Sequence, residues 1–289
     1  MFFTLALLSM LGYTIQGTLL VKYARTMDGM ALAMYRNLSL ALSMLPIFFF
    51  VDFSQAATLS TAWLELLLGA ISGALALSLS LAAQKSLPVG ISSAFSGIRI
   101  LLLFLWGYWF FRETITLIQA FASLIIIGAL ITLSASKNQM PHLDGRGRRG
   151  IFLALLGTFF GSLAFLMVSI AARKTDPLLA GYIWEVAIGV CALLILCGQK
   201  FFWNLKFPRI PTRQFWHIAL LSSGTLLGTG AFALAVSRGP IGIVNAIGST
   251  SIVVSALLSH FLYAEKLRFR QWFAIGLVML GLIGLRLGL

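Results

Sequence analysis

Residues 88–119 read PVGISSAFSGIRILLLFLWGYWFFRETITLIQ, and residues 240–271 read PIGIVNAIGSTSIVVSALLSHFLYAEKLRFRQ. The two stretches align without a gap at an offset of 152 residues (240 − 88). The identical residues at their two ends include Pro88 and Pro240, Glu113 and Glu265, and Gln119 and Gln271. Shared apolar composition does not produce matches of proline and charged residues, so this region is predicted to occur twice in the chain.

A second match extends the repeat to the beginning of each half. Residues 5–28 align with residues 153–176 at an offset of 148 (176 − 28), and the identical residues include Arg25 and Arg173, and Asp28 and Asp176. The sequence therefore predicts an internal duplication, with a first repeat at residues 1–135, a polar, basic linker at 136–149 and a second repeat at 150–289.

The composition predicts a membrane protein. Of the 289 residues, 60% are hydrophobic and 10% are charged, and the mean hydropathy is +0.97; soluble domains average about 45–50% apolar and about 25% charged residues. Runs of about 20 apolar residues, enough to cross a bilayer, lie at residues 2–21, 30–51, 62–83, 90–111, 115–135, 150–172, 178–198, 215–236, 243–263 and 270–288. They lack the alternation of barrel strands. We therefore expect an all-α integral membrane protein with ten transmembrane helices.

Five helices in each repeat have a topological consequence. Because five is odd, the second repeat must enter the membrane from the opposite side, which predicts two inverted five-helix repeats related by an axis in the membrane plane. Transporters built in this way hold their substrate near the bilayer midplane, between the repeats, and work by alternating access.

The formal charge of +13 arises from 21 Lys and Arg against eight Asp and Glu. The basic residues lie between apolar runs, so they are interpreted as topology signals and not as a nucleic-acid surface. Fourteen fall in the loops after odd-numbered runs and five in the other loops. The positive-inside rule then places the linker in the cytoplasm and both termini outside.

Three ionisable residues stand well inside the apolar runs: Arg36, Arg99 and Glu185. A charge at the centre of a transmembrane helix costs about 2.5–3.5 kcal/mol, so such residues usually face the bundle interior or a wet cavity. Arg99 lies about 14 Å into its helix at about 1.5 Å per residue, close to the midplane. Arg36 and Glu185 are expected to be offset by roughly 10 Å along the membrane normal, in contact only if both side chains reach inward.

Two interpretations of these charges remain open at this stage. In one, Arg99 and Arg36 bind a carboxylate or another anion, and Glu185 binds an ammonium group or carries a coupling proton. In the other, the three residues form a self-neutralising structural network. Further polar and aromatic residues inside the runs are candidates for lining the same cavity, namely Tyr13, Gln16, Trp184, Asn245, Ser251 and Ser96. Ser251 occupies the position equivalent to Arg99.

The ordered set of motifs resembles the drug/metabolite transporter superfamily, in its ten-helix branch built from two EamA-type domains. The motifs are ALLSMLGYTIQ (6–16), MYRN (34–37), SLPVGISSAF (86–95) and FFRETITLIQ (110–119), followed by SRGPIGIVNAI (237–247) and YAEKLRFRQWFAIGLVMLG (263–281). The resemblance implies secondary transport of a small metabolite, often amino-acid export, in a bacterial inner membrane and with both termini inside. The first helix departs from the family pattern, because Leu11-Gly12 is followed by Tyr13 where relatives often carry Trp-Gly and a nearby Asn.

The expected partners are a small-molecule substrate, the lipid bilayer and protons as the candidate coupling ion, with a monomer sufficient for transport and no cofactor. Two other functions stay open: a drug or lipid flippase of the same fold, and an intramembrane lipid-modifying enzyme. The enzyme is disfavoured because all four aspartates (Asp28, Asp52, Asp144 and Asp176) lie in predicted loops, away from any acid–base cluster.

Overall fold

The computed structural model describes the whole chain except residues 85–86, 88, 135–144, 205–206, 264–267 and 289. Its α-helices are α1 (Phe2–Thr26), α2 (Gly29–Ser43), α3 (Trp63–Gln84), α4 (Val89–Phe111), α5 (Leu117–Ser134), α6 (Gly145–Lys174), α7 (Pro177–Trp203), α8 (Thr212–Ser222), α9 (Gly224–Val236), α10 (Ile241–Ser249), α11 (Ser251–Tyr263) and α12 (Phe269–Leu287). Two 3₁₀ segments, η1 (Leu45–Phe49) and η2 (Phe53–Thr61), join α2 to α3. The described residues contain no strand.

The structure confirms the predicted class, an all-helical protein with helices suited to a membrane. Seven segments are long and apolar enough to cross a membrane, and three shorter apolar helices lie at Gly97–Phe111, Leu117–Leu133 and Ile241–Leu257. These segments fall on the ten predicted runs.

Three of the predicted runs are not continuous α-helices. The second changes to 3₁₀ geometry at η1, where Pro46 has no N–H to donate and would clash with the preceding turn of an α-helix. The eighth breaks at Ser223 and the ninth at Thr250, whose hydroxyls each bond a carbonyl three residues back, at 2.7 Å. Such bonds compete with the helical ladder and bend helices.

The repeated polar residues cap equivalent helices. Asp28 accepts hydrogen bonds from two backbone amides at the start of α2, and Asp176 accepts one from Leu179 at the start of α7. In the same way Gln119 accepts from the amide of Thr116 before α5, at 3.0 Å. Its equivalent, Gln271, accepts a hydrogen bond from the backbone amide of Arg268 before α12, at 2.8 Å. The repeat is therefore preserved at helix starts, where orphan N–H groups need partners.

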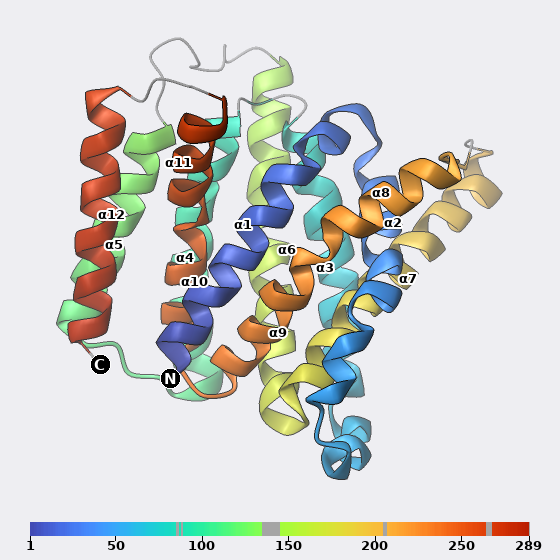
Figure 1. Ribbon diagram of the computed structural model, residues 1–289, viewed down its shortest axis with the longest axis horizontal. Coiled ribbons are helices and arrows are strands. Elements are labelled where there is room, and N and C mark those ends of the chain that lie inside the picture. Colours follow the sequence, from blue (N-terminus) through green and yellow to red (C-terminus); the bar gives the residue numbers. More distant parts are fainter. Residues whose placement is uncertain (85–86, 88, 135–144, 205–206, 264–267, 289) are drawn as a thin grey trace.

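The helices of the two halves are interleaved. The most extensive contacts join α3 to α6, α1 to α9, α5 to α12 and α2 to α7, and each of these pairs takes one helix from each half. Figure 1 shows α5 and α12 side by side at one end of the molecule, and α2 with α7 toward the other. In the repeat, α1 is equivalent to α6, α2 to α7, α3 to the segment α8–α9, and α5 to α12. The contact between α3 and α6 is therefore equivalent to the contact between α9 and α1. The α2–α7 and α5–α12 contacts each join a helix to its own equivalent.

Small residues allow the closest of these crossings. A Cβ added to Gly12 of α1 would lie 2.4 Å from the backbone nitrogen of Gly228 on α9. On the equivalent pair, a Cβ on Gly157 of α6 would lie 2.8 Å from the Ser80 hydroxyl of α3. Backbones that approach this closely are typical of helix pairs in membranes.

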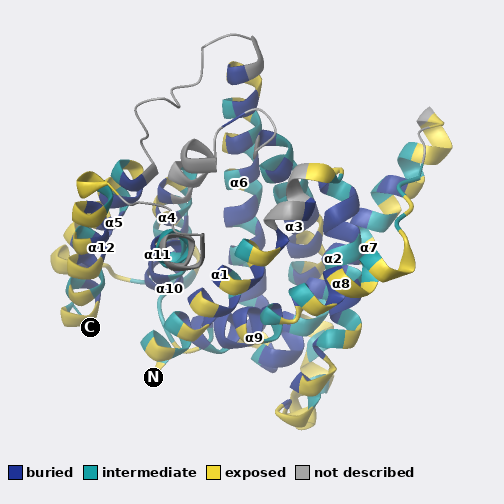
Figure 2. Cartoon of the chain, turned by 45° about the horizontal axis from the view of Figure 1, so that its top comes forward, coloured by how far each residue is buried: buried dark blue, intermediate teal, exposed yellow. Residues whose placement is uncertain are grey.

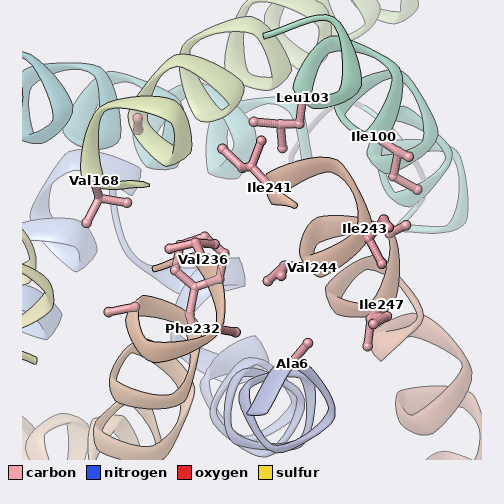
Figure 3. Close-up of a cluster of buried hydrophobic side chains, with 14 of the residues drawn as sticks. Ala6, Ile100, Leu103, Val168, Phe232, Val236, Ile241, Ile243, Val244 and Ile247 are labelled. Carbon is pink, nitrogen blue, oxygen red and sulfur yellow. The ribbon is translucent and has the colours of Figure 1, made fainter. Parts of the chain in front are cut away.

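Apolar side chains fill the interior and also cover the outside. Around Ala6 of α1, buried residues converge from four other helices (Figure 3), namely Ile100, Leu103, Val168, Phe232, Val236, Ile241, Ile243, Val244 and Ile247. The outward faces of α5 and α12 are exposed (Figure 2) and carry large apolar side chains such as Phe121, Phe273 and Leu280, which are 64%, 58% and 60% exposed. So much exposed apolar surface suits a lipid environment.

Candidate functional site

A hydrogen-bonded network links the two halves where α2 packs on α7. Arg36 of α2 donates from Nη1 to Glu185 Oε2 of α7, at 3.2 Å, and to Asn37 Oδ1, at 2.7 Å. Its Nη2 donates to Gln16 Oε1 of α1, at 3.2 Å, and to the Thr225 hydroxyl of α9, at 3.4 Å. The guanidinium of Arg36 therefore has four acceptors on four helices.

Glu185 is the centre of this network. Its Oε1 accepts a hydrogen bond from Thr229 of α9, at 2.5 Å, and its Oε2 accepts one from Asn37 Nδ2, at 2.7 Å, besides the bond from Arg36. Thr229 is in turn bonded to the hydroxyl of Tyr13, at 2.7 Å. The side chain of Glu185 is only 2% exposed, so its carboxylate is enclosed by donors from both halves.

The structure differs here from the expected offset between Arg36 and Glu185. Asn37 and Glu185 occupy equivalent positions of the two repeats (37 + 148 = 185), and the Asn37 amide also donates to the backbone carbonyl of Glu185, at 2.9 Å. Because these equivalent positions touch, Arg36 next to Asn37 reaches Glu185 directly instead of lying about 10 Å away along the normal.

Arg99 of α4 has no such partners. Its buried Nε makes no hydrogen bond, and no ion pair or hydrogen bond joins its guanidinium to any residue that the structure describes. The carbon at its centre lies 5.4 Å from the ring centroid of Phe165 on α6. A cation–π contact uses the face of the guanidinium and not its N–H donors, so Arg99 keeps its capacity to bind an anion.

Arg36, Arg99 and Glu185 line one cavity of about 290 Å³. Its aromatic walls come from Tyr13, Phe165 and Trp184. Small and aliphatic residues complete the lining on α3, α6 and α7, namely Gly73, Ala76, Leu77, Ser80, Gly157, Gly161, Ala164 and Ile188. The cavity extends from Glu185 along α3 and α6 toward the end of the molecule where α3 finishes and α6 begins. Larger grooves beside α8 and beside α4, of about 620 and 530 Å³, are more open.

At the opposite end of α6 an ion pair joins the halves. Arg173 donates from Nη2 to Glu113 Oε1, at 2.6 Å, and Glu113 Oε2 accepts the backbone amide of Ile241 at the start of α10, at 3.0 Å. The Arg173 guanidinium also bonds the carbonyls of Val236 and Gly239 and covers the ring of Phe111, 3.7 Å from its centroid. This cluster ties α4, α6, α9 and α10 together.

The structure brings most of the predicted site residues together. Tyr13, Trp184 and the three charged residues line the cavity, and Gln16 lies behind Arg36 with its own Nε2 buried and unbonded. Gln16 itself does not line the cavity, and neither do two further predicted residues, Asn245 and Ser251. Asn245 is buried and bonds the carbonyl of Ile241 on its own helix, at 3.0 Å, and Ser251 begins α11 after the break at Thr250. The side chain of Ser96 lies outside the described residues.

Sequence reasoning missed the neutral members of the network, Asn37, Thr225 and Thr229, together with Phe165. Polar neutral residues are common in transmembrane helices, so their presence alone is a weak signal. Asn37 could have been found, because it is the repeat equivalent of Glu185. The two threonines lie four residues apart on one face of α9, which is informative only once α9 is known to pack on α1.

Comparison with known proteins agrees with this architecture. The model of the EamA-like transporter family matches residues 2–135 and 148–287. A solved structure described as "Crystal structure of protein" superposes with a TM-score of 0.78, covers 99% of this chain and 96% of its own, and is 13% identical in sequence. It shows the fold alone. None of the curated proteins matches the sequence.

Proposed function

The chain belongs to the EamA-like transporter family, and we propose from this that it is a secondary transporter that moves a small anionic or zwitterionic metabolite through the cavity by alternating access. The resemblance favours export across a bacterial inner membrane, and a monomer would be sufficient for transport, since the described lining of the cavity comes from one chain. The observation that carries the proposal is the guanidinium of Arg99, which is paired with no residue that the structure describes and lines a cavity built by helices of both halves.

The packing supports ten membrane crossings arranged as two inverted repeats, 1–135 and 150–289, joined by the linker 136–149. A two-fold axis between the repeats requires that each contact between two helices recur between their equivalents, and the α3–α6 and α1–α9 contacts are such a pair. Two equivalent positions can touch only close to such an axis, and Asn37 touches Glu185. Because the axis of an inverted repeat lies in the membrane plane, Glu185 and the cavity beside it would lie near the bilayer midplane.

The two arginines would have different roles. Arg36 already holds a carboxylate and three neutral acceptors, so it would position Glu185 and join the halves. Arg99 would bind the substrate anion through its planar fork of N–H donors. An unpaired charge in a membrane interior is expensive and therefore marks a functional site, and a bound substrate anion would compensate the charge of Arg99.

Glu185 would couple transport to protons. Its carboxylate holds donors from α2 and α9, on opposite halves of the protein. A proton on Glu185 would neutralise the carboxylate and weaken its bond to Arg36, which loosens the contact between α2 and α7. Proton binding would then bias the two arrangements of the halves, as a switch must.

The two ends of the molecule fit alternating access. The Glu113–Arg173 cluster closes the contact among α4, α6, α9 and α10, whereas the cavity extends toward the other end, at Ser80 and Gly157. Transport would require that cluster to open while the helices around Ser80 close. The repeat supplies equivalents for both partners, Arg25 and Glu265, in the sequence.

Uptake by the purified, reconstituted protein tests the proposal. Proteoliposomes are offered radiolabelled amino acids, organic acids, nucleosides and lipids, and the recovered solute is analysed. We expect accumulation of at least one small solute in unchanged form, above protein-free liposomes. Chemically altered solute would indicate an enzyme, and movement of lipids alone would indicate a flippase; either result contradicts the proposal.

A further inference from the structure

The cavity selects a narrower class of substrate than the family resemblance implies. We propose that it binds a monocarboxylate that has an apolar body and no ammonium group, with the carboxylate on Arg99. The proposal rests on the proposed transport function and specifies its substrate.

The charges of the cavity require one anion. Its described lining contains two permanent cations, Arg36 and Arg99, and one carboxylate, Glu185. Arg36 and Glu185 neutralise each other at 3.2 Å. One positive charge is left, on a guanidinium whose Nε is buried and unbonded. A single carboxylate balances this charge, whereas a dicarboxylate would bring a second negative charge, and the described lining has no further cation to meet it.

Among the described lining residues, the cavity offers an ammonium group no carboxylate that is free of other donors, and the remaining side-chain acceptors are the neutral hydroxyls of Tyr13 and Ser80. Both oxygens of Glu185 are occupied by donors from Arg36, Asn37 and Thr229, and the Tyr13 hydroxyl is bonded to Thr229. Elsewhere, Glu65 and Glu113 are paired with basic residues at helix ends. An ammonium group taken from water into this site would exchange its hydration for at most these neutral hydroxyls, with no free carboxylate to balance its charge.

The position of an α-ammonium makes the conflict worse. In an α-amino acid the ammonium group is attached next to the carboxylate, so a carboxylate bound by Arg99 would bring a second cation within a few ångströms of the guanidinium. Like charges at that separation repel strongly in a medium of low dielectric constant. A zwitterion would therefore bind more weakly than the acid of the same shape.

The rest of the lining fits an apolar body. Phe165 and Trp184 pack against each other with ring centroids 5.8 Å apart, and the facing surfaces of α3 and α6 carry glycine and alanine. These surfaces leave room beside the rings and offer few polar groups. A volume of about 290 Å³ is at the lower end of the range for small-molecule pockets, which begins at about 300 Å³, so the body is small.

Matched ligands separate the charge from the shape. The purified protein is heated with 3-phenylpropionate, phenylalanine or phenethylamine, and in a second series with 4-methylpentanoate, leucine or 3-methylbutylamine. In each series the body is similar and only the charged groups differ. We expect the acid to raise the melting temperature in at least one series, with an apparent affinity at least about tenfold above that of the amino acid, and the amine to have no effect.

Variants assign the effect to Arg99. Arg99→Gln should reduce the apparent affinity for the acid by at least about tenfold, the size expected for loss of hydrogen bonds to a charged group. Arg99→Lys, which keeps the charge and loses the planar fork, should fall between Arg99→Gln and wild type. Arg286→Gln makes the same substitution at an exposed position of α12 and should bind as wild type does.

Each outcome decides the proposal. An amino acid or amine that binds as well as the acid, an acid effect that survives Arg99→Gln, or no stabilisation by either acid would overturn it. The proposed function is judged separately by uptake: if the reconstituted protein accumulates amino acids, transport stands and the monocarboxylate assignment falls. If no solute is accumulated, the transport function itself falls.

Discussion

Glu185→Gln removes the charge at the centre of the network and keeps the size of the side chain. Three donors meet the carboxylate, and the glutamine amide keeps one acceptor oxygen, so one or two of these hydrogen bonds are lost, at about 0.6 kcal/mol each, or about 1 kcal/mol in total. Removing one partner of a fully buried ion pair costs about 3–5 kcal/mol. Arg36 is 13% exposed and keeps three neutral acceptors. We therefore expect a loss in the free energy of unfolding between these two values, about 2–3 kcal/mol.

The assay is reversible unfolding of the purified protein in bicelles, with Arg36→Met completing a double-mutant cycle. The double variant should lose about 1–2 kcal/mol less than the sum of the single variants, because neither charge is then left unpaired. Glu65→Gln is the matched control: its partner, Lys174, is 42% exposed, and such pairs contribute about 0–1 kcal/mol. Additive losses, or a Glu185→Gln variant as stable as wild type, would refute the interpretation of Glu185 as the centre of a link between the halves.

Three further predictions concern packing, coupling and orientation. Gly12→Ala should destabilise the protein by about 1–3 kcal/mol through overpacking against Gly228. Gly17→Ala is the control and should be neutral or stabilising, because a Cβ at Gly17 of the same helix meets nothing within 4 Å. Equal effects of the two substitutions in the unfolding assay would contradict this prediction. Glu185→Gln should flatten the pH dependence of transport, and an unchanged pH profile of uptake would exclude Glu185 as the proton carrier. A reporter fused to the C-terminus should be active outside the cytoplasm, as the basic loops predict; a cytoplasmic C-terminus would show that the family expectation holds instead.

The positions of the helices follow from the sequence because each one depends on local properties. Apolar length fixes where the chain can cross a bilayer, and Asp28 and Gln119 recur in the second half because each repeat must cap the same helix starts. The breaks at Ser223 and Thr250 were not predicted. A hydroxyl that bonds its own backbone leaves the apolar pattern unchanged, so the hydropathy of the run gives no sign of it.

The site could be predicted only in part, for a different reason. The cost of an intramembrane charge marks Arg36, Arg99 and Glu185 as inward-facing wherever their helices pack. Which arginine is paired depends on contacts between the two halves, and Asn37 and Thr229 supply those contacts. Sequence spacing along one helix carries no information about the partner helix.

The most direct test of the account is solute counterflow in proteoliposomes. Vesicles loaded with an unlabelled solute that the uptake panel identifies are diluted into the labelled form, and the transient accumulation is measured for wild type, Arg99→Gln and Arg286→Gln. We predict counterflow for wild type and Arg286→Gln, and a loss of at least about tenfold for a folded, correctly inserted Arg99→Gln. Counterflow by Arg99→Gln at the wild-type rate would contradict the claim that this guanidinium binds the transported anion.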